Sequence, residues 1–127
     1  VTVSIRGPSV RVLADPVALQ QIVHNLLNNA LQALADRSTP EPTVTVRLHA
    51  EQGQGILTIS DNGPGIDPDD LARVFEPFYS TRPGGLGLGL SLCAALTQSM
   101  HGSLQASNAD AGGAQFRLAL PLAGTHP

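Results

Sequence analysis

The chain has 127 residues, a formal net charge of −3, and charged residues at only 13% of its positions. This length fits one domain with a single core and is too short for two. A nucleic-acid-binding surface would need clustered Lys and Arg, so the sparse, mildly acidic charge argues against that class. No apolar run reaches the roughly 20 residues that cross a bilayer, and we expect no membrane contact from this domain. The single cysteine, Cys93, can form no internal disulfide, which is typical of a reducing compartment.

The first half of the sequence combines strand patterns with one amphipathic helix. Asp15 followed by Pro16 is typical of a helix N-cap and a first helical residue. Apolar residues then recur at helical spacing as far as Leu34. Apolar runs before and after this helix predict strands. In chain order we expect two strands at 1–6 and 10–15 joined as a hairpin by the turn GPS, a helix from Pro16, a loop at 36–42, and strands at 43–50 and 55–61.

The second half is richer in glycine. Asp67 opens the run DPDDLARVF as a capping residue. Residues 76–89 have no hydrophobic period and many glycines, so we expect a mobile loop there, above all at 79–87. The apolar helix that follows stops at HG, where Gly102 is predicted to take the left-handed conformation of a C-cap. In chain order we expect a short helix at 67–75, the loop at 76–89, a helix at 88–100, and strands at 103–108 and 114–122.

This order of elements contains more hairpin connections than strand–helix–strand crossovers. The sheet should therefore be mixed and mostly antiparallel, with the helices on one face. The predicted fold class is α+β, as a two-layer sandwich. We expect residues 1–127 to form a single domain. Because the sequence begins inside a strand-like run, we also expect it to be a fragment of a longer protein.

Two asparagines on the first helix are candidates for chemistry. Asn25 and Asn29 are four residues apart and share one helix face, at the edge of the apolar stripe. Asparagine is a poor helix former because its amide competes for backbone hydrogen bonds. One interpretation is a solvated polar face, which we favour for Asn28. The other is that the Asn29 amide oxygen binds Mg²⁺, which takes only one or two protein oxygens beside water and phosphate.

The run GGLGLGL before the second long helix is a candidate phosphate loop. Glycine lets the backbone approach a ligand closely, and the helix N-terminus that follows presents free N–H groups to an anion. Neither the dinucleotide fingerprint nor the P-loop fits, since Leu90 stands where the former needs Gly and the latter needs Lys. A flexible linker is the alternative, although the interleaved leucines indicate a loop that packs against something.

These signals occur in a familiar order. NLLNNALQAL, DNGPGI, FEPFYSTR, GLGLGLSL and GGAQF resemble the N box, first glycine box, F box, second glycine box and last glycine motif of the ATP-binding domain of sensor histidine kinases. The resemblance runs from ADPVALQQIV to FRLALPL. The segments NALQAL, PFYSTR and GLSLC are most similar to the nitrogen-regulation and dicarboxylate-sensing branch of this family. It implies the Bergerat-type ATP-binding fold shared with gyrase B, the mismatch-repair ATPases and the heat-shock chaperone ATPases.

The resemblance implies a role for each motif. Asp61 would accept a hydrogen bond from the adenine amino group, Asn29 would bind Mg²⁺, and Arg82 would reach the terminal phosphate. Phe75 and Phe78 would be hydrophobic latches of the lid. The implied catalytic residues are Asn25, Asn29 and Arg82; the implied nucleotide-binding residues are Asn29, Asp61, Gly63, Gly65, Ile66, Thr81, Arg82, Gly85, Leu86, Gly87, Leu88 and Gly89.

Two positions depart from the family pattern. Many of these kinases carry a basic residue just after the N box, where this chain has Leu31, Gln32 and Ala33. Phosphate charge would therefore be neutralised mainly by Mg²⁺ and Arg82. The last motif often has a threonine near the base, and here Ala114 stands in its place, so we do not expect a ligand contact from that side chain.

By this resemblance the chain would bind Mg·ATP and pass the γ-phosphoryl group to a histidine. That histidine would lie on a helical dimerisation domain outside this sequence, and a response regulator would be reached indirectly. The setting implied is a cytoplasmic domain, for example of an inner-membrane sensor. One alternative is an ATP hydrolase of the same fold that clamps a partner. Another is a non-catalytic docking module, which would not need Asp61, Asn29 and the glycines.

Overall fold

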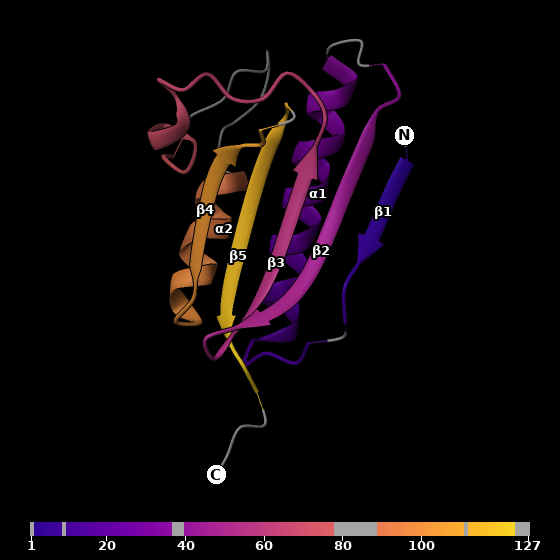
Figure 1. Cartoon of the computed structure of the whole chain (residues 1–127). Helices are drawn as coiled ribbons and strands as arrows, with labels where there is room; N and C mark the ends of the chain where they lie inside the picture. Colours follow the sequence, from indigo (N-terminus) through magenta and orange to yellow (C-terminus); the bar gives the residue numbers. More distant parts are fainter. Residues whose placement is uncertain (1, 9, 37–39, 78–88, 111, 124–127) are drawn as a thin grey trace.

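The computed structural model describes residues 2–8, 10–36, 40–77, 89–110 and 112–123. Within them, a five-stranded sheet in the order β1-β2-β3-β5-β4 is covered on one face by two helices (Figure 1). β1 is parallel to β2, and the other pairings are antiparallel. The predicted α+β sandwich with a mixed, mostly antiparallel sheet is confirmed. The elements are β1 (Thr2–Arg6), α1 (Pro16–Asp36), β2 (Thr43–Glu51), β3 (Gln54–Asp61), the 3-10 helix η1 (Leu71–Arg73), α2 (Gly89–Ser99), β4 (Ser103–Asn108) and β5 (Ala114–Pro121).

The core lies between α1 and α2 on one side and the sheet on the other. The start of α1 is fixed as the sequence predicts, because the carbonyl of Asp15 accepts from the Leu19 N–H at 2.9 Å and its carboxylate accepts from the Val17 N–H at 3.1 Å. Every fourth residue of the α1 stripe is then buried against the strands. The buried members of this stripe are Ile22, Leu26, Ala30 and Leu34, and they meet Val44, Val46, Ile59, Phe116, Leu118 and Leu120 of the sheet. In the described residues, no helix is long and apolar enough to cross a membrane.

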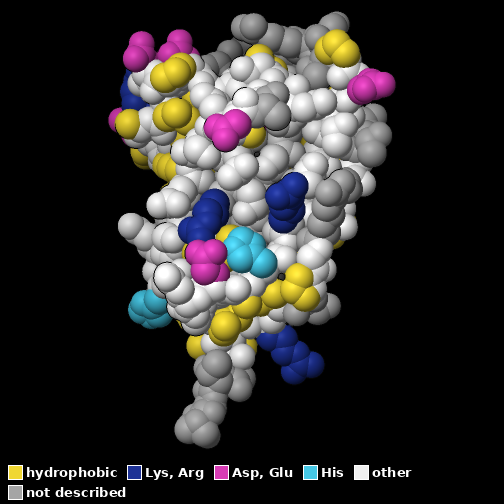
Figure 2. Space-filling model, viewed as in Figure 1, with side chains coloured by type: hydrophobic (Ala, Val, Ile, Leu, Met, Phe, Trp, Pro, Cys, Tyr) yellow, Lys and Arg dark blue, Asp and Glu magenta, His cyan; other side chains and the backbone are white. Residues whose placement is uncertain are grey.

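The other face of the sheet is polar. Charged and histidine side chains gather near its middle in the helix-free view of Figure 2. Glu51 there accepts from Arg117 at 3.1 Å and lies 3.3 Å from the His49 ring nitrogen. Exposed pairs of this kind contribute only about 0–1 kcal/mol each. This face is therefore solvated, which is consistent with two layers rather than three.

The predicted N-terminal hairpin is wrong. β1 pairs in parallel with β2 instead of forming a hairpin. Residues 10–14 do not return along β1 but run past β2 and β3 to the segment after β5, where Val12 bridges Leu122. Gly55 explains this path: a Cβ there would lie 2.4 Å from Val12 and 2.8 Å from Val10, so its missing side chain leaves a notch that these valines fill. Apolar burial in that notch outweighs local hairpin pairing.

Two helix ends also differ from expectation. In the run at 67–75, Asp67 accepts from the N–H of Asp69 at 2.9 Å, as a capping residue would, but the helix that follows is only the 3-10 turn Leu71–Arg73. The backbone bonds there join residues three apart, such as Asp70 N–H to the Asp67 carbonyl at 2.8 Å, and do not continue as an α-helix. At the end of α2 the left-handed residue is His101, with φ 61°, and not Gly102. Gly102 is required for a different reason, since a Cβ there would lie 2.4 Å from the carbonyl oxygen of Ala119.

Candidate functional site

Asp61 is a buried carboxylate at the end of the central strand β3. It is 5% exposed, and its Oδ1 accepts from the N–H of Gly63 at 2.9 Å and of Ala114 at 3.3 Å. Among the described residues, no donor contacts its other oxygen, Oδ2. A buried carboxylate oxygen without a donor is unfavourable. The site therefore fits a ligand that supplies an N–H at this point, as the amino group of adenine would.

The turn after Asp61 packs on the end of α1. A Cβ at Gly63 would lie 3.3 Å from Leu34 of that helix and 3.2 Å from Asp61 Oδ1, so the backbone passes close to both. Gly65 has φ 81°, a conformation that side chains rarely adopt. Gly63 therefore lies beside the Asp61 carboxylate, and Gly65 takes a conformation that favours glycine and lies beside Asn108.

Two asparagines that sequence reasoning missed hold this turn. Asn62 accepts from the N–H of Thr43 at 2.8 Å and donates to the carbonyl of Glu41 at 3.0 Å, which ties the turn to the start of β2. Asn108, at the end of β4, makes the equivalent pair of bonds to the backbone of Ile66. Asn62 could have been noticed as the polar neighbour of Asp61. Nothing in the local sequence marks Asn108.

The asparagines of α1 have three different environments. Asn28 is exposed and bonds His24 at 3.0 Å, which confirms a solvated face for that position. Asn25 is half-buried, and its side chain lies near the Cys93 thiol of α2 and acts to lower the pKa of that thiol. Burial raises the pKa of the Cys93 thiol, and the effect of Asn25 offsets only part of the rise. Asn29 is half-buried, and no described residue bonds its amide, so it fits a ligand or a metal ion.

The packing of α1 on α2 brings these residues to one end of the molecule. Cys93 Sγ donates to the carbonyl of Ile22 at 3.8 Å and lies near Asn25, which sets the register of the two helices. The helices run in opposite directions (Figure 1). One turn further along α1 is Asn29, and one turn back along α2 is Gly89, so both lie toward the end where β3 finishes at Asp61.

The rest of the predicted site is not in the described part of the chain. Thr81, Arg82, Gly85, Leu86, Gly87 and Leu88 lie outside the described residues, as do Phe78 and the loop expected to be mobile. Phe75 is described, and its ring packs edge-on against Phe116 with centroids 6.1 Å apart, as a hydrophobic anchor would. Within the described residues, no three His, Cys, Asp or Glu side chains gather as metal ligands.

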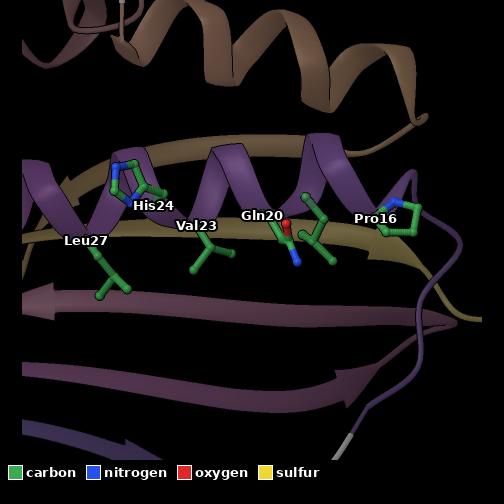
Figure 3. Close-up of a pocket in the computed structure, with 6 residues that line it drawn as sticks. Pro16, Gln20, Val23, His24 and Leu27 are labelled. Carbon is green, nitrogen blue, oxygen red and sulfur yellow. The ribbon is translucent and has the colours of Figure 1, made fainter.

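A separate pocket of about 540 Å³ lies along the first half of α1. Figure 3 shows Val23 and Leu27 projecting from the same side of the helix. The pocket is lined by Pro16, Leu19, Gln20, Val23, His24 and Leu27. None of the predicted site residues is among them, and the pocket lies toward the opposite end of α1 from the turn at Gly63. This pocket is therefore separate from the proposed site around Asp61.

The comparisons with known proteins agree with this geometry. Residues 14–124 match the family described as histidine kinase-, DNA gyrase B-, and HSP90-like ATPase. The C4-dicarboxylate transport sensor protein DctB of Pseudomonas aeruginosa is 42% identical over 111 residues, which are 86% of this chain but only 18% of that protein. The chain thus spans about a fifth of the length of that curated relative.

Solved structures of sensor kinases have the same fold. The mycobacterial sensor histidine kinase MprB matches with a TM-score of 0.83 and 31% identity, covering 98% of this chain and 83% of that one. Full-length ShkA in complex with AMPPNP matches with a TM-score of 0.80 and 31% identity, covering 99% of this chain and 26% of that one. The chain therefore belongs to the histidine kinase-, DNA gyrase B- and HSP90-like ATPase family, as an ATP-binding catalytic domain of the sensor histidine kinase type.

Proposed function

We propose that the chain binds Mg·ATP with the adenine base at Asp61. The observation that carries this proposal is the asymmetry of the Asp61 carboxylate. Backbone N–H groups occupy Oδ1, while Oδ2 meets no donor in the described residues. The adenine amino group supplies the missing N–H, and the glycine turn at Gly63, Gly65 and Ile66 lets the flat base lie against backbone. The structure of the related full-length ShkA, which is in complex with AMPPNP, supports nucleotide binding.

The phosphate side of the proposed site is built on the two helices. The Asn29 amide oxygen is the proposed protein ligand of Mg²⁺, which completes its shell with water and phosphate oxygens. Gly89 is the first residue of α2, and the N–H groups of this helix N-terminus are proposed to face the phosphates, since such groups favour anions. Arg82, with Thr81 and the glycine loop at 84–88, is proposed to reach the phosphates from outside the described residues.

The proposed reaction is transfer of the γ-phosphoryl group to a histidine on a helical phosphoacceptor domain of the same protein. Such transfers rely mainly on positioning and charge neutralisation, and the residues named here supply both. A response regulator would take the phosphoryl group onward, and no nucleic acid is involved. The setting proposed is a cytoplasmic domain of a sensor protein, on the analogy of the sensor proteins that the chain resembles.

A hydrolase of the same fold is the second candidate, and Asn25 argues against it. By family resemblance the hydrolases carry a glutamate at this position to activate water. Asn25 has a neutral amide, and its side chain lies near the Cys93 thiol. An amide orients a water molecule but cannot accept its proton near neutral pH. The site therefore favours transfer to an imidazole, which brings its own lone pair.

Calorimetric titration of the chain with ATP, with Mg²⁺ and then with EDTA, tests the proposal. We expect the wild type to bind ATP more tightly with Mg²⁺, and Asn29→Ala to lose that difference while keeping its fold. Asn28→Ala is the matched control, since this amide is exposed and, among the described residues, bonds His24 alone. Equal affinity of the wild type with Mg²⁺ and with EDTA would contradict the metal assignment.

A further inference from the structure

The turn that follows Asp61 leaves the sheet after one backbone bond, from the Asn62 N–H to the Thr43 carbonyl at 3.2 Å. Residues 62–66 leave the sheet after β3, and Gly65 takes a positive φ of 81°. If this turn were flexible, the backbone surface against which the base is proposed to lie would have no fixed position. A site whose competent shape is only partly populated binds its ligand more weakly in proportion. Residues that fix this turn therefore affect affinity without touching the ligand.

Asn108 fixes the far end of the turn with both polar atoms of its amide. Its Oδ1 accepts from the N–H of Ile66 at 2.7 Å, and its Nδ2 donates to the carbonyl of Ile66 at 2.6 Å. This pair satisfies both backbone groups of one residue, as a neighbouring strand would. The same Oδ1 would lie 2.9 Å from a Cβ at Gly65, so the amide also sits directly against the positive-φ glycine.

The backbone of Asn108 is connected to the Asp61 carboxylate through one strand pair. In the β4–β5 ladder Asn108 lies opposite Ala114, whose N–H donates to Asp61 Oδ1 at 3.3 Å. Next to it, Gly113 passes so close to the carbonyl of Asp61 that no Cβ would fit. The end of the β4–β5 hairpin thus holds the carboxylate from one side and, through Asn108, the turn from the other.

We propose that Asn108 is a positioning residue for adenine recognition, which sets the distance between the Asp61 carboxylate and the Gly65–Ile66 wall of the base site. This inference rests on the proposed function of Asp61 and adds a residue from a different part of the sequence. It predicts an effect on the base and none on the metal, because the bonds of Asn108 reach only the turn at Ile66.

Titrations of the whole chain with ADP and with GDP, in EDTA and in Mg²⁺, test this role. Asn108→Ala should bind ADP about tenfold more weakly, as the loss of one or two hydrogen bonds implies, in EDTA as well as in Mg²⁺. The preference for ADP over GDP should fall by a similar factor. Asn108→Asp has the same shape but an ionised carboxylate that cannot donate to the Ile66 carbonyl, so it should bind ADP no better than Asn108→Ala.

Gln115→Ala is the control, because it removes a hydrogen bond of 3.2 Å between β5 and Ser60 on the solvated face of the same strands. It should leave ADP affinity unchanged. If Asn108→Ala does not fold, Asn108→Ser keeps one of the two bonds and should show a smaller loss in the same direction. Folded variants with wild-type ADP affinity, or with equal losses for ADP and GDP, would overturn the role of Asn108. A wild type without preference between ADP and GDP would overturn the assignment of Asp61 first, and that of Asn108 with it.

Discussion

At the scale of single residues, the site depends on how each buried polar atom is satisfied. Asp61 and Cys93 are both buried, yet their situations differ. The Asp61 carboxylate has two backbone donors on one oxygen, and its second oxygen has none in the described part of the chain. The Cys93 thiol is fully buried and donates weakly to the carbonyl of Ile22. The Asp61 carboxylate is suited to recognition of a ligand, and the Cys93 thiol is suited to packing between the helices. A separate prediction follows from each.

Asp61→Asn should lose adenine recognition without losing the fold. The amide oxygen can still accept from Gly63 and Ala114, but the amide nitrogen then occupies the place of Oδ2 and points a donor at the adenine amino group. We expect ATP affinity to fall by about 1.5–3 kcal/mol, the range for a hydrogen bond to a charged group. Titration with ATP and GTP measures the change. Wild-type ATP affinity in the folded variant would show that the base does not meet this carboxylate.

Cys93 should make stability fall at alkaline pH. Because burial raises the pKa of the thiol in the folded chain, only the unfolded chain loses this proton at the ordinary value of 9.0. The free energy of unfolding is thus unaffected by Cys93 below that value and declines as pH rises above it, by at most about 1.4 kcal/mol per pH unit. The sequence has one tyrosine and all seven of its Lys and Arg positions are Arg, so few other groups titrate there. Urea unfolding between pH 8 and 10 measures the slope.

Cys93→Ser is the matched variant, since a hydroxyl of similar size can still donate to the Ile22 carbonyl but does not ionise in this range. Its stability should stay nearly constant where that of the wild type declines. Parallel curves for the two proteins would mean that the alkaline loss comes from another group.

At the scale of elements, the local hydrophobic pattern predicted the long helices and strands correctly, but its predictions for the turns between them were wrong. The α1 stripe, the β2–β3 pair and the β4–β5 pair have a clear hydrophobic period, and the structure confirms them. The prediction of a hairpin at GPS was wrong because Gly55, more than 40 residues away in sequence, leaves space that Val10 and Val12 fill. The prediction of a left-handed conformation at Gly102 was wrong because close contact with the Ala119 carbonyl, rather than backbone conformation, requires glycine there. Both errors come from tertiary contacts that a local window does not contain.

The end of α2 offers a paired test of this distinction. His101→Gly should stabilise the chain by about 1 kcal/mol, because a side chain at φ 61° bears the left-handed penalty that glycine avoids. Gly102→Ala should destabilise it by about 1–3 kcal/mol, because the new Cβ meets the carbonyl of Ala119 and the side chain of Leu120. Urea midpoints of the two variants against wild type measure both effects. If His101→Gly were destabilising instead, the left-handed assignment at residue 101 would be in error.

At the scale of the whole molecule, the fold gathers one site from distant parts of the chain. The second half of α1, the end of β3, the start of α2 and the end of the β4–β5 hairpin meet at one end of the sandwich (Figure 1). The order of the motifs predicted Asp61, Asn29 and Gly89 as site residues from the sequence. The bonds of Asn62 and Asn108 could not be predicted, because their partners are backbone groups at Glu41, Thr43 and Ile66 whose positions only the folded sheet fixes.

The behaviour of the whole domain follows from what this end of the molecule lacks as well as what it holds. The residue one helical turn before Asn29 is Asn25, whose neutral amide cannot act as a general base. Loss of a general base typically lowers a rate by about 10²–10⁴-fold. Slow hydrolysis keeps the γ-phosphoryl group intact until an acceptor histidine arrives, so the isolated chain should bind ATP and hardly hydrolyse it.

Phosphate release from the purified chain with Mg·ATP measures this directly. We expect little release, no further decrease in Asn25→Ala, and phosphotransfer only when a histidine-bearing helical domain is supplied in cis or in trans. Asn25→Glu restores a carboxylate where the hydrolases of this family carry one, and it should raise phosphate release if the rest of the site is intact. Fast turnover by the wild type that disappears in Asn25→Ala would instead mean that the Asn25 amide directs a competent water, and the domain would then be a hydrolase rather than a kinase module.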